Sequence, residues 1–373
     1  MGSSTPESVI DTAMSTLRAF NRSPVPNELS QWICDAVDVS NPEKRGQVWL
    51  NTWSRWKSLA PFFVSHGLYL YDYTSDVDRG ASPPGVPKAR HSTSEQPPWA
   101  RRAYNQEEDL DFDCLETVRI WPARDADGHE VIIRLVSGPN PSEELKIFLR
   151  LNTPDARKDP RNHTLPVLKY LTFNKLIFVV LPRWDTVAHS PWVTSNTVSE
   201  LLDLAEAFYE GLEFLHEKRI AHRDIHPSNT VMNVLATPGE ELNELRASGS
   251  VHYAFIDFDS SIAFPENADL STLRVQRLMR NPVLYMGLKP GLCDPFKDDV
   301  LCLTATTQTM VRVIENVVPE VGLFFDKILH CTYDDVPSAL QALQSFRRWR
   351  AGVTHDQQRE PPGGSFWKGR TRK

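Results

Sequence analysis

The chain has 373 residues, 40% of them hydrophobic and 24% charged, a globular composition with room for two or three units that each bury a core. Its formal net charge of −7 argues against a protein that binds nucleic acid by neutralising phosphates. The five cysteines form no C-x-x-C pair, which argues against a disulfide framework or a zinc site and favours a reducing intracellular compartment, cytoplasmic or nuclear.

Residues 1–73 are expected to form a helical N-terminal extension. Their opening, MGSSTPESVI, lacks the basic and apolar regions of a secretory signal, and no apolar run in the chain reaches membrane-spanning length. Trp49, Trp53 and Trp56 recur at helical spacing, which places three indoles on one helical face. This stripe predicts packing against the rest of the protein. The alternative is a groove for a peptide or ligand, through which the extension would bind a protein partner.

Residues 74–105 are rich in proline, serine and glycine and show almost no apolar period. That composition predicts a linker or a long loop. A compact pattern of strands followed by amphipathic helices runs from about residue 106 to about residue 350. Residues 351–373 form a tail with a basic end, whose charges we expect to be solvated.

The compact region opens with a predicted strand and a predicted helix. GHEVIIRLV (128–136) has the character of a strand that follows a D-G turn. NPSEELKIFLRLN (140–152) is predicted to be a helix with Asn140 as its N-cap, Pro141 as its first residue and Glu143 as the glutamate of a capping box.

A second helix leads into the motif IAHRDIHPSN (220–229). The segment 199–217 repeats large apolar residues at helical spacing, namely Leu201, Leu204, Phe208, Leu212 and Leu215. Further on, VHYAFIDFDSS (251–261) has the character of a strand that carries Asp257 and Asp259. Because residues two apart share a strand face, these carboxylates are predicted to point together toward one cation.

Asp224, Asn229 and Asp257 have the types and the order that phosphoryl transfer requires. An aspartate accepts the proton of the incoming hydroxyl, while an asparagine and a second aspartate hold Mg²⁺ against the phosphates of ATP. The full string, G-L-x-F-L-H-x-x-x-I-x-H-R-D-x-x-x-x-N followed by D-F, is too long for a chance match.

With these motifs, the chain resembles the eukaryotic protein-kinase fold and is similar to divergent kinase-like proteins of mushroom-forming fungi. The resemblance implies an α+β, two-lobed fold with a small antiparallel-sheet lobe (106–184) and a large helical lobe (185–350) behind the N-terminal extension. HTLPVL (163–168) and LIFVVLPRW (176–184) resemble the fourth and fifth strands of the small lobe. The implied activity is transfer of phosphate from ATP, with Mg²⁺, to a Ser/Thr hydroxyl of a protein.

The resemblance also implies roles for single residues. Asp224 would be the catalytic base, and its neighbour Arg223 would either bind a phosphorylated activation segment or have a structural role. Asn229, Asp257 and Asp259 would hold the metal. The implied nucleotide contacts are Arg134, in the place of the usual lysine, with its ion-pair partner Glu144, and Ile132, Leu181, Arg183 and Val231. His222 would be a core residue, and Asp299 would brace the loop.

Two other interpretations remain open, because several positions depart from the kinase pattern. Residues 112–128 contain no glycine-rich loop, Arg134 replaces the lysine, and Asp259 replaces the glycine of D-F-G. These departures suit a pseudokinase that binds partners as a scaffold. The motif H-x-D-x-H-x-x-N with a D-x-D also resembles small-molecule phosphotransferases of the aminoglycoside and choline kinase type, in which His226 and Asp259 would be natural.

Overall fold

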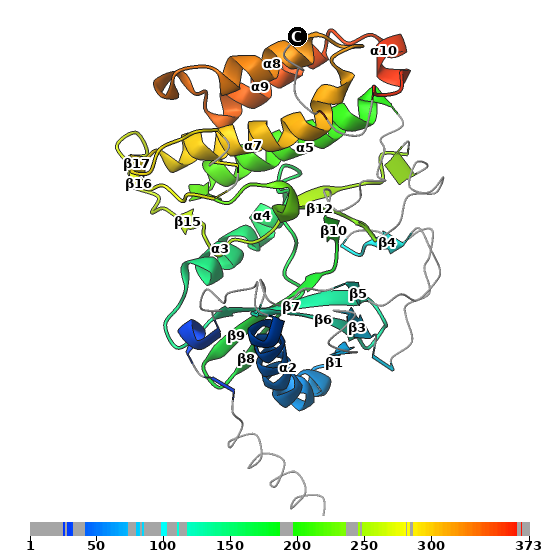
Figure 1. Cartoon of the computed structure of the whole chain (residues 1–373), viewed down its shortest axis with the longest axis vertical. Helices are drawn as coiled ribbons and strands as arrows, with labels where there is room; N and C mark the ends of the chain where they lie inside the picture. Colours follow the sequence, from blue (N-terminus) through cyan, green and yellow to red (C-terminus); the bar gives the residue numbers. More distant parts are fainter. Residues whose placement is uncertain are drawn as a thin grey trace, which may run out of the picture. The chain divides into compact units, whose positions relative to one another are not determined.

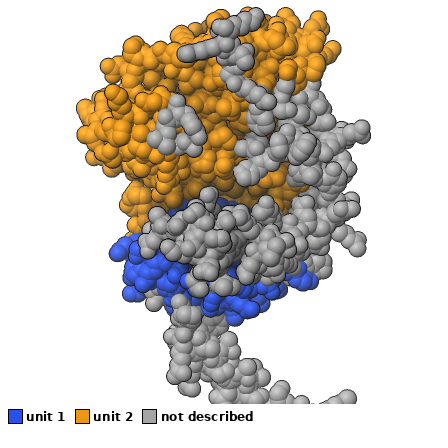
Figure 2. Space-filling view, viewed as in Figure 1, with its two compact units in different colours: residues 1–90, 106–140, 169–181 blue, residues 91–105, 141–168, 182–373 orange. Residues whose placement is uncertain are grey.

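The computed structural model describes residues 25–26, 28–32, 42–73, 80–82, 84–85, 98–102, 110–111, 118–186, 197–235, 245–246, 248–280, 282–283, 286–363 and 367. The chain forms two compact units (Figure 2). Unit 1 comprises residues 1–90, 106–140 and 169–181, and unit 2 comprises residues 91–105, 141–168 and 182–373. Together they make an α+β protein, as the sequence predicts.

Unit 1 is built on a five-stranded sheet with the order β1-β6-β7-β9-β8 (Figure 1). The pairs β1–β6, β6–β7 and β8–β9 are antiparallel. A second, three-stranded sheet has the order β2-β3-β5. The strands of unit 1 are β1 (Leu68–Leu70), β2 (Asp72–Tyr73), β3 (Gly80–Ser82), β5 (Leu110–Asp111), β6 (Ile120–Asp125), β7 (Glu130–Ser137), β8 (Lys169–Phe173) and β9 (Leu176–Pro182).

Helix α2 (Pro42–Ser65) covers one face of this sheet with aromatic side chains. Trp56 is fully buried and stacks on Trp121 of β6, with 6.0 Å between the ring centroids. Its ring also meets Phe178 of β9 edge to face, and Trp53 stacks on Trp121. The predicted packing stripe is therefore confirmed for Trp53 and Trp56, while the side chain of Trp49 lies outside the described residues.

The units divide the chain differently from the predicted boundaries. β1 pairs with β6, so residues 42–73 belong to the sheet unit instead of forming a separate extension. Within the predicted linker 74–105, β3 pairs with β2 and β5, and β4 (Arg101–Arg102) pairs with a strand of unit 2. The helix predicted over 140–152 belongs to unit 2. Helical periodicity identifies an apolar face, but it does not identify the surface that the face covers.

Unit 2 is mostly helical. Helix α5 (Val198–Glu217) packs against α7 (Pro295–Val311) and α9 (Ala339–Arg350), and α7 packs against α8 (Glu320–Leu329) (Figure 1). Its other helices are α3 (Glu143–Leu151), α4 (Pro154–Lys158) and α10 (His355–Arg359). The helix predicted over 199–217 is confirmed as α5, and all five of its predicted apolar residues are buried. Thr197 caps α5 by accepting the N–H of Glu200.

Short strands connect the helices of unit 2 and position its loops. A three-stranded sheet has the order β10-β12-β14, and three two-stranded pairs are β11–β15, β13–β4 and β16–β17. The bounds are β10 (Asp185–Thr186), β11 (Ile220–Ala221), β12 (Thr230–Met232), β13 (Val234–Leu235), β14 (Tyr253–Phe255), β15 (Ile262–Ala263), β16 (Val275–Gln276) and β17 (Leu292–Cys293). Among the described residues, no helix is both long enough and apolar enough to span a membrane.

Two predicted element boundaries are wrong. Helix α3 begins at Glu143, and its N-cap is Ser142, whose hydroxyl accepts the N–H of Leu145 at 3.0 Å. A serine in extended conformation directly before the helix outcompetes the predicted cap, Asn140. The strand predicted at 163–168 is β8, at Lys169–Phe173, because the segment 163–168 contains Pro166, which has no N–H for a ladder.

Candidate active site

The loop after α5 is fixed at its backbone by one carboxylate. Asp299 of α7 accepts the N–H of His222 on Oδ2 and the N–H of Arg223 on Oδ1, each at 2.7 Å. Asp299 is 1% exposed, and charge-assisted bonds of this kind are about twice as strong as neutral ones. Arg223 has a φ of +67°, a conformation that these bonds help to hold. The predicted bracing role of Asp299 is confirmed.

His222 is a core residue, as predicted. It is fully buried and its ring contacts Phe255 and Phe258. Its Nε2 lies 3.0 Å from the carbonyl of Ile256, and its Nδ1 accepts the N–H of Asp224. The ring therefore carries a proton on Nε2 and uses Nδ1 as an acceptor. Both nitrogens are engaged in positioning the loop.

Asp224 is buried with its two oxygens in different environments. Oδ2 accepts from Nη1 of Arg280 at 2.8 Å. Among the described residues, Oδ1 has no hydrogen-bond partner although it is buried. Nε2 of His226 lies 3.9 Å from Oδ1, a distance that is too long for a hydrogen bond. The two oxygens of this carboxylate therefore differ: one is paired with a cation, and the other has no hydrogen bond among the described residues.

Hydrogen bonds tie Asn229, and the residue before Asp257, to the same loop. The Nδ2 of Asn229 donates to the carbonyl of Asp224 at 2.9 Å. The carbonyl of Asn229 accepts the N–H of Ile256 at 3.1 Å, and Asp257 follows directly. Because the Asn229 nitrogen is used, its Oδ1 remains the group for a cation. Amide and carboxylate oxygens are the ligands that Mg²⁺ prefers, so this donor set fits the metal.

The predicted strand over 251–261 is wrong at its second half. β14 ends at Phe255, and Asp257 has a φ of +65°, which no strand residue has. Asp257 and Asp259 therefore do not share a strand face. Asp259 is exposed, and its Oδ1 accepts the hydroxyl of Ser260 at 2.9 Å.

Arg223 tethers the segment that follows Asp259. Its guanidinium donates to the carbonyl of Ser260 at 3.1 Å and to the carbonyl of Gln276 at 2.8 Å. Burial lowers the pKa of Arg223, and the two carbonyls compensate the buried charge in part. Of its two predicted roles, the structural one is observed.

Three of the predicted nucleotide contacts share one face of the unit 1 sheet. Ile133 pairs with Trp121, whose ring contacts α2, so Ile132 and Arg134 point to the opposite face. Phe178 contacts Trp56 of α2, so Leu181, three residues further along β9, also points away from α2. The structure therefore brings Ile132, Arg134 and Leu181 onto the same surface.

The remaining predicted contacts belong to unit 2. Glu144 is buried in the first turn of α3. Arg183 follows β9 and is half-buried, and Val231 is buried in β12. Sequence reasoning missed Arg280, because an arginine 56 residues beyond Asp224 belongs to no motif. Only the folded chain brings the two side chains together.

A second group of possible metal ligands lies at the β6–β7 turn in unit 1. Asp125, Asp127 and His129 have ligand atoms within 4.8 Å of one another. However, Oδ1 of Asp125 accepts the N–H groups of Asp127 and His129, the bonding of an Asx turn. Gly128, with a φ of +87°, completes the predicted D-G turn. The cluster is explained by the hairpin.

Comparison with known proteins assigns no family to this chain. No protein-family model matches it, and no curated protein matches it either. The function proposed below therefore rests on the residues and their geometry.

Proposed function

We propose that this chain is a protein-kinase-like phosphotransferase that moves the γ-phosphate of ATP to a Ser/Thr hydroxyl of a protein acceptor. The observation that carries the proposal is Oδ1 of Asp224, a buried carboxylate oxygen without a hydrogen-bond partner among the described residues. An unpaired buried polar atom costs about 1–3 kcal/mol. A proton-accepting role explains why the fold tolerates that cost at the aspartate of the H-R-D motif.

Each residue of the candidate site has its own role in the proposed phosphate transfer. Asp224 accepts the proton of the acceptor hydroxyl while the hydroxyl oxygen attacks the γ-phosphorus of ATP. The bond from that phosphorus to the ADP oxygen then breaks. Asn229, Asp257 and Asp259 would hold Mg²⁺, which neutralises charge on the phosphates. Arg134 would contact the phosphates. The antiparallel sheet of unit 1 and the helical unit 2 support this assignment.

A scaffold function is favoured by a different observation. Arg280 already occupies Oδ2 of Asp224, and the segment 112–128 has no glycine-rich loop. A chain of this kind would use the same fold to bind protein partners without transferring phosphate, and it would keep Asp224 as a buried ion-pair partner.

A small-molecule phosphotransferase is favoured by the position of His226. Its Nε2 lies 3.9 Å from Oδ1 of Asp224, so a small alcohol or amine could contact both groups. In that case the acceptor would be a metabolite-sized molecule, and no protein substrate would be needed.

Two measurements separate these functions. The first is the melting temperature with millimolar ATP in Mg²⁺ and in EDTA, for the wild type and for Asp257→Ala. ATP at about a hundred times its dissociation constant stabilises the folded state by about 2.7 kcal/mol. We expect a shift that requires Mg²⁺ and is lost in Asp257→Ala. The exposed Asp334 provides the matched control, Asp334→Asn, which should keep the shift.

The second measurement is phosphate transfer, followed by mass spectrometry on the protein itself and on a generic protein acceptor. Asp224→Asn should lower the rate by about 10²- to 10⁴-fold, the usual contribution of a general base. A normal ATP shift without any transfer would favour the scaffold function. Transfer to small alcohols or amines, with none to protein, would favour the third function. No ATP shift under any condition would refute the proposed kinase.

A further inference from the structure

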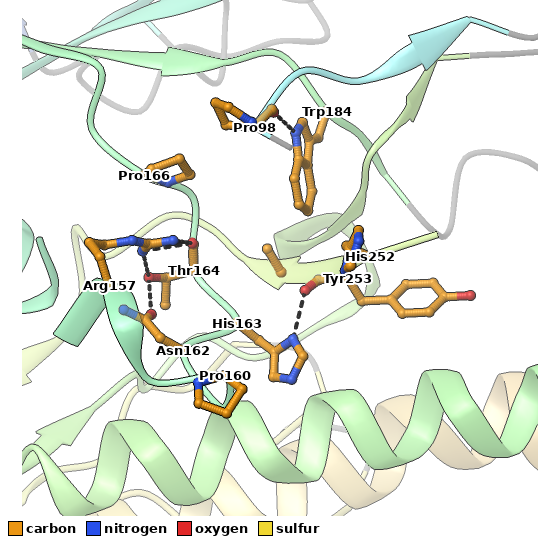
Figure 3. A pocket seen from close by; sticks show the side chains of 11 residues that line it. Pro98, Arg157, Pro160, Asn162, His163, Thr164, Pro166, Trp184, His252 and Tyr253 are labelled. Atoms are coloured by element: carbon orange, nitrogen blue, oxygen red, sulfur yellow. Dashed lines mark hydrogen bonds between the residues drawn. The ribbon is translucent and has the colours of Figure 1, made fainter. Parts of the chain in front are cut away.

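Unit 2 contains a cavity of about 380 Å³ that the proposed phosphotransfer does not use (Figure 3). Its walls come from the end of α4 and the loop after it, from Pro98, from Trp184 and from β14. Cavities that hold small molecules have volumes of about 300–1,000 Å³. The lining residues on which the inference rests are Pro98, Arg157, Asn162, His163, Thr164 and Trp184.

Arg157 gives one wall of this cavity a positive charge. Its Nη1 donates to the carbonyl and to the hydroxyl of Thr164, at 3.0 and 3.1 Å, and its Nη2 donates to the same carbonyl at 3.0 Å. The Thr164 hydroxyl donates in turn to Oδ1 of Asn162 at 2.6 Å, which fixes the group. A guanidinium has five N–H donors, so Nε–H and one N–H of Nη2 remain. Those two donors lie on one edge and point the same way.

The charge on Arg157 lacks a counterion among the described residues, where its hydrogen-bond partners are neutral groups of Thr164. Arg161, four residues further on, is different. It pairs with Asp159, Glu213 and Glu217 at 2.6–2.7 Å. Hydrogen bonds to these carboxylates raise the pKa of Arg161, whereas burial lowers the pKa of Arg157. Carboxylates thus neutralise the charge of Arg161, whereas the charge of Arg157 has no carboxylate partner among the described residues.

The other side of the cavity is apolar, with Trp184 held by a hydrogen bond. Nε1 of Trp184 donates to the carbonyl of Pro98 at 2.8 Å, which satisfies the indole and fixes its plane. Figure 3 shows Trp184 and Pro98 on one side of the cavity and Arg157 with Thr164 on another. His163 adds no free donor, because its Nδ1 contacts the Tyr253 carbonyl and its Nε2 contacts a carboxylate of α5.

We infer that this cavity binds a small organic anion, with its carboxylate or phosphate on the free edge of Arg157 and a planar apolar body against Trp184. Arginine pairs with both head groups through two parallel N–H···O bonds. The bound anion supplies the negative charge that Arg157 lacks. This inference does not depend on the proposed phosphotransfer.

The test uses benzoate and phenyl phosphate as probes on the full chain. Binding is followed by calorimetry and by the indole N–H resonance of Trp184, which the Trp184→Phe spectrum identifies. We expect saturable binding of at least one probe and a shift of that resonance. Arg157→Gln should weaken binding at least tenfold, while the exposed neighbour provides a control, Lys158→Gln, with less than a twofold change. Neutral benzyl alcohol should not compete.

The comparison of the two probes identifies the head group that the cavity prefers. Unchanged binding to Arg157→Gln would overturn the inference, as would no saturable binding of either probe. Because Arg157 also holds Thr164, the melting temperature of each variant is measured first. If Arg157→Gln does not fold, Arg157→Lys serves in its place. It keeps the charge but not the two parallel donors, so it should also bind at least tenfold more weakly.

Discussion

Nη1 of Arg280 lies 2.8 Å from Oδ2 of Asp224, so the proposed proton acceptor is already paired with a cation. The same nitrogen donates to the hydroxyl of Ser260 at 3.0 Å. The side chain of Arg280 is 52% exposed, whereas that of Asp224 is 6% exposed. The arginine can therefore leave for solvent at little cost, while the carboxylate stays in place. The pair occupies one of the two oxygens of Asp224 and leaves the other without a hydrogen bond among the described residues.

Arg280→Ala is expected to increase phosphate transfer roughly threefold to fivefold, because an ion pair whose arginine is 52% exposed contributes up to about 1 kcal/mol. Initial rates of autophosphorylation at saturating ATP check this. The control is Arg274→Ala, since Arg274 is exposed and donates to the nearby carbonyls of Ser271 and Leu273. A lower rate in folded Arg280→Ala would mean that Arg280 helps to bind the phosphates or the acceptor.

Trp56→Ala is expected to reduce the free energy of unfolding by about 3–5 kcal/mol, as for other large core aromatics. Trp56 is fully buried and donates from Nε1 to the carbonyl of Val118 at 3.1 Å. Chemical denaturation followed by circular dichroism gives the value. Ser54→Ala, on an exposed position of the same helix, should change it by less than about 0.5 kcal/mol. A small effect of Trp56→Ala would show that α2 is dispensable for unit 1.

Gly211→Ala is expected to destabilise the protein by about 1–3 kcal/mol, the usual cost of overpacking. A Cβ at this helical position would lie 2.8 Å from the Cβ of His163 and 3.1 Å from the ring of Phe255. That clash outweighs the gain of about 0.5–1 kcal/mol that alanine normally brings to a helix. A Cβ at Gly85 would meet nothing within 4 Å, so Gly85→Ala should leave the melting temperature unchanged. An increase for Gly211→Ala would contradict the close packing of α5.

Arg161→Gln is expected to destabilise the protein at neutral pH by up to about 1 kcal/mol, because its partners are partly exposed. Hydrogen bonds from Arg161 lower the pKa of Asp159 and of Glu217. A carboxyl whose pKa is lower in the folded state than in the unfolded state stabilises the protein when the pH is above its unfolded-state pKa, which is about 4. This stabilisation is lost as the pH falls through the pKa of the folded state. The difference between wild type and variant should thus shrink below about pH 4. Arg348→Gln, at an exposed position of α9, should show no such trend.

The sequence predicts unit 2 better than unit 1, for physical reasons. The apolar spacing of α5 identifies a buried helix directly, and the H-R-D-x-x-x-x-N string fixes the loop that follows it. In contrast, β1 and β6 are neighbours in the sheet although residues 71–119 lie between them. Periodicity reports on local faces and carries no information on such distant pairing. This is why residues 42–73 are predicted as an extension and observed as part of the sheet.

Within the candidate site, the sequence predicts which residues are present better than it predicts their backbone conformations. Asp224, Asn229 and Asp299 follow from the resemblance, and two bonds agree with it: Nδ2 of Asn229 donates to the carbonyl of Asp224, and Oδ1 of Asp299 accepts the N–H of Arg223. The left-handed conformation of Asp257 is not readable from V-H-Y-A-F-I-D-F-D, which has the composition of a continuous strand. The ion pair of Arg280 depends on a long-range contact that no spacing rule describes.

The two bonds from Asp299 to the N–H groups of His222 and Arg223 also set an order of events during folding. Asp299 lies in α7, more than seventy residues beyond the loop, so the loop cannot take its native backbone until that helix has docked. The amides of His222 and Arg223 should consequently exchange with deuterium only through global unfolding. The loop would then be completed last during folding and, in the native state, released last.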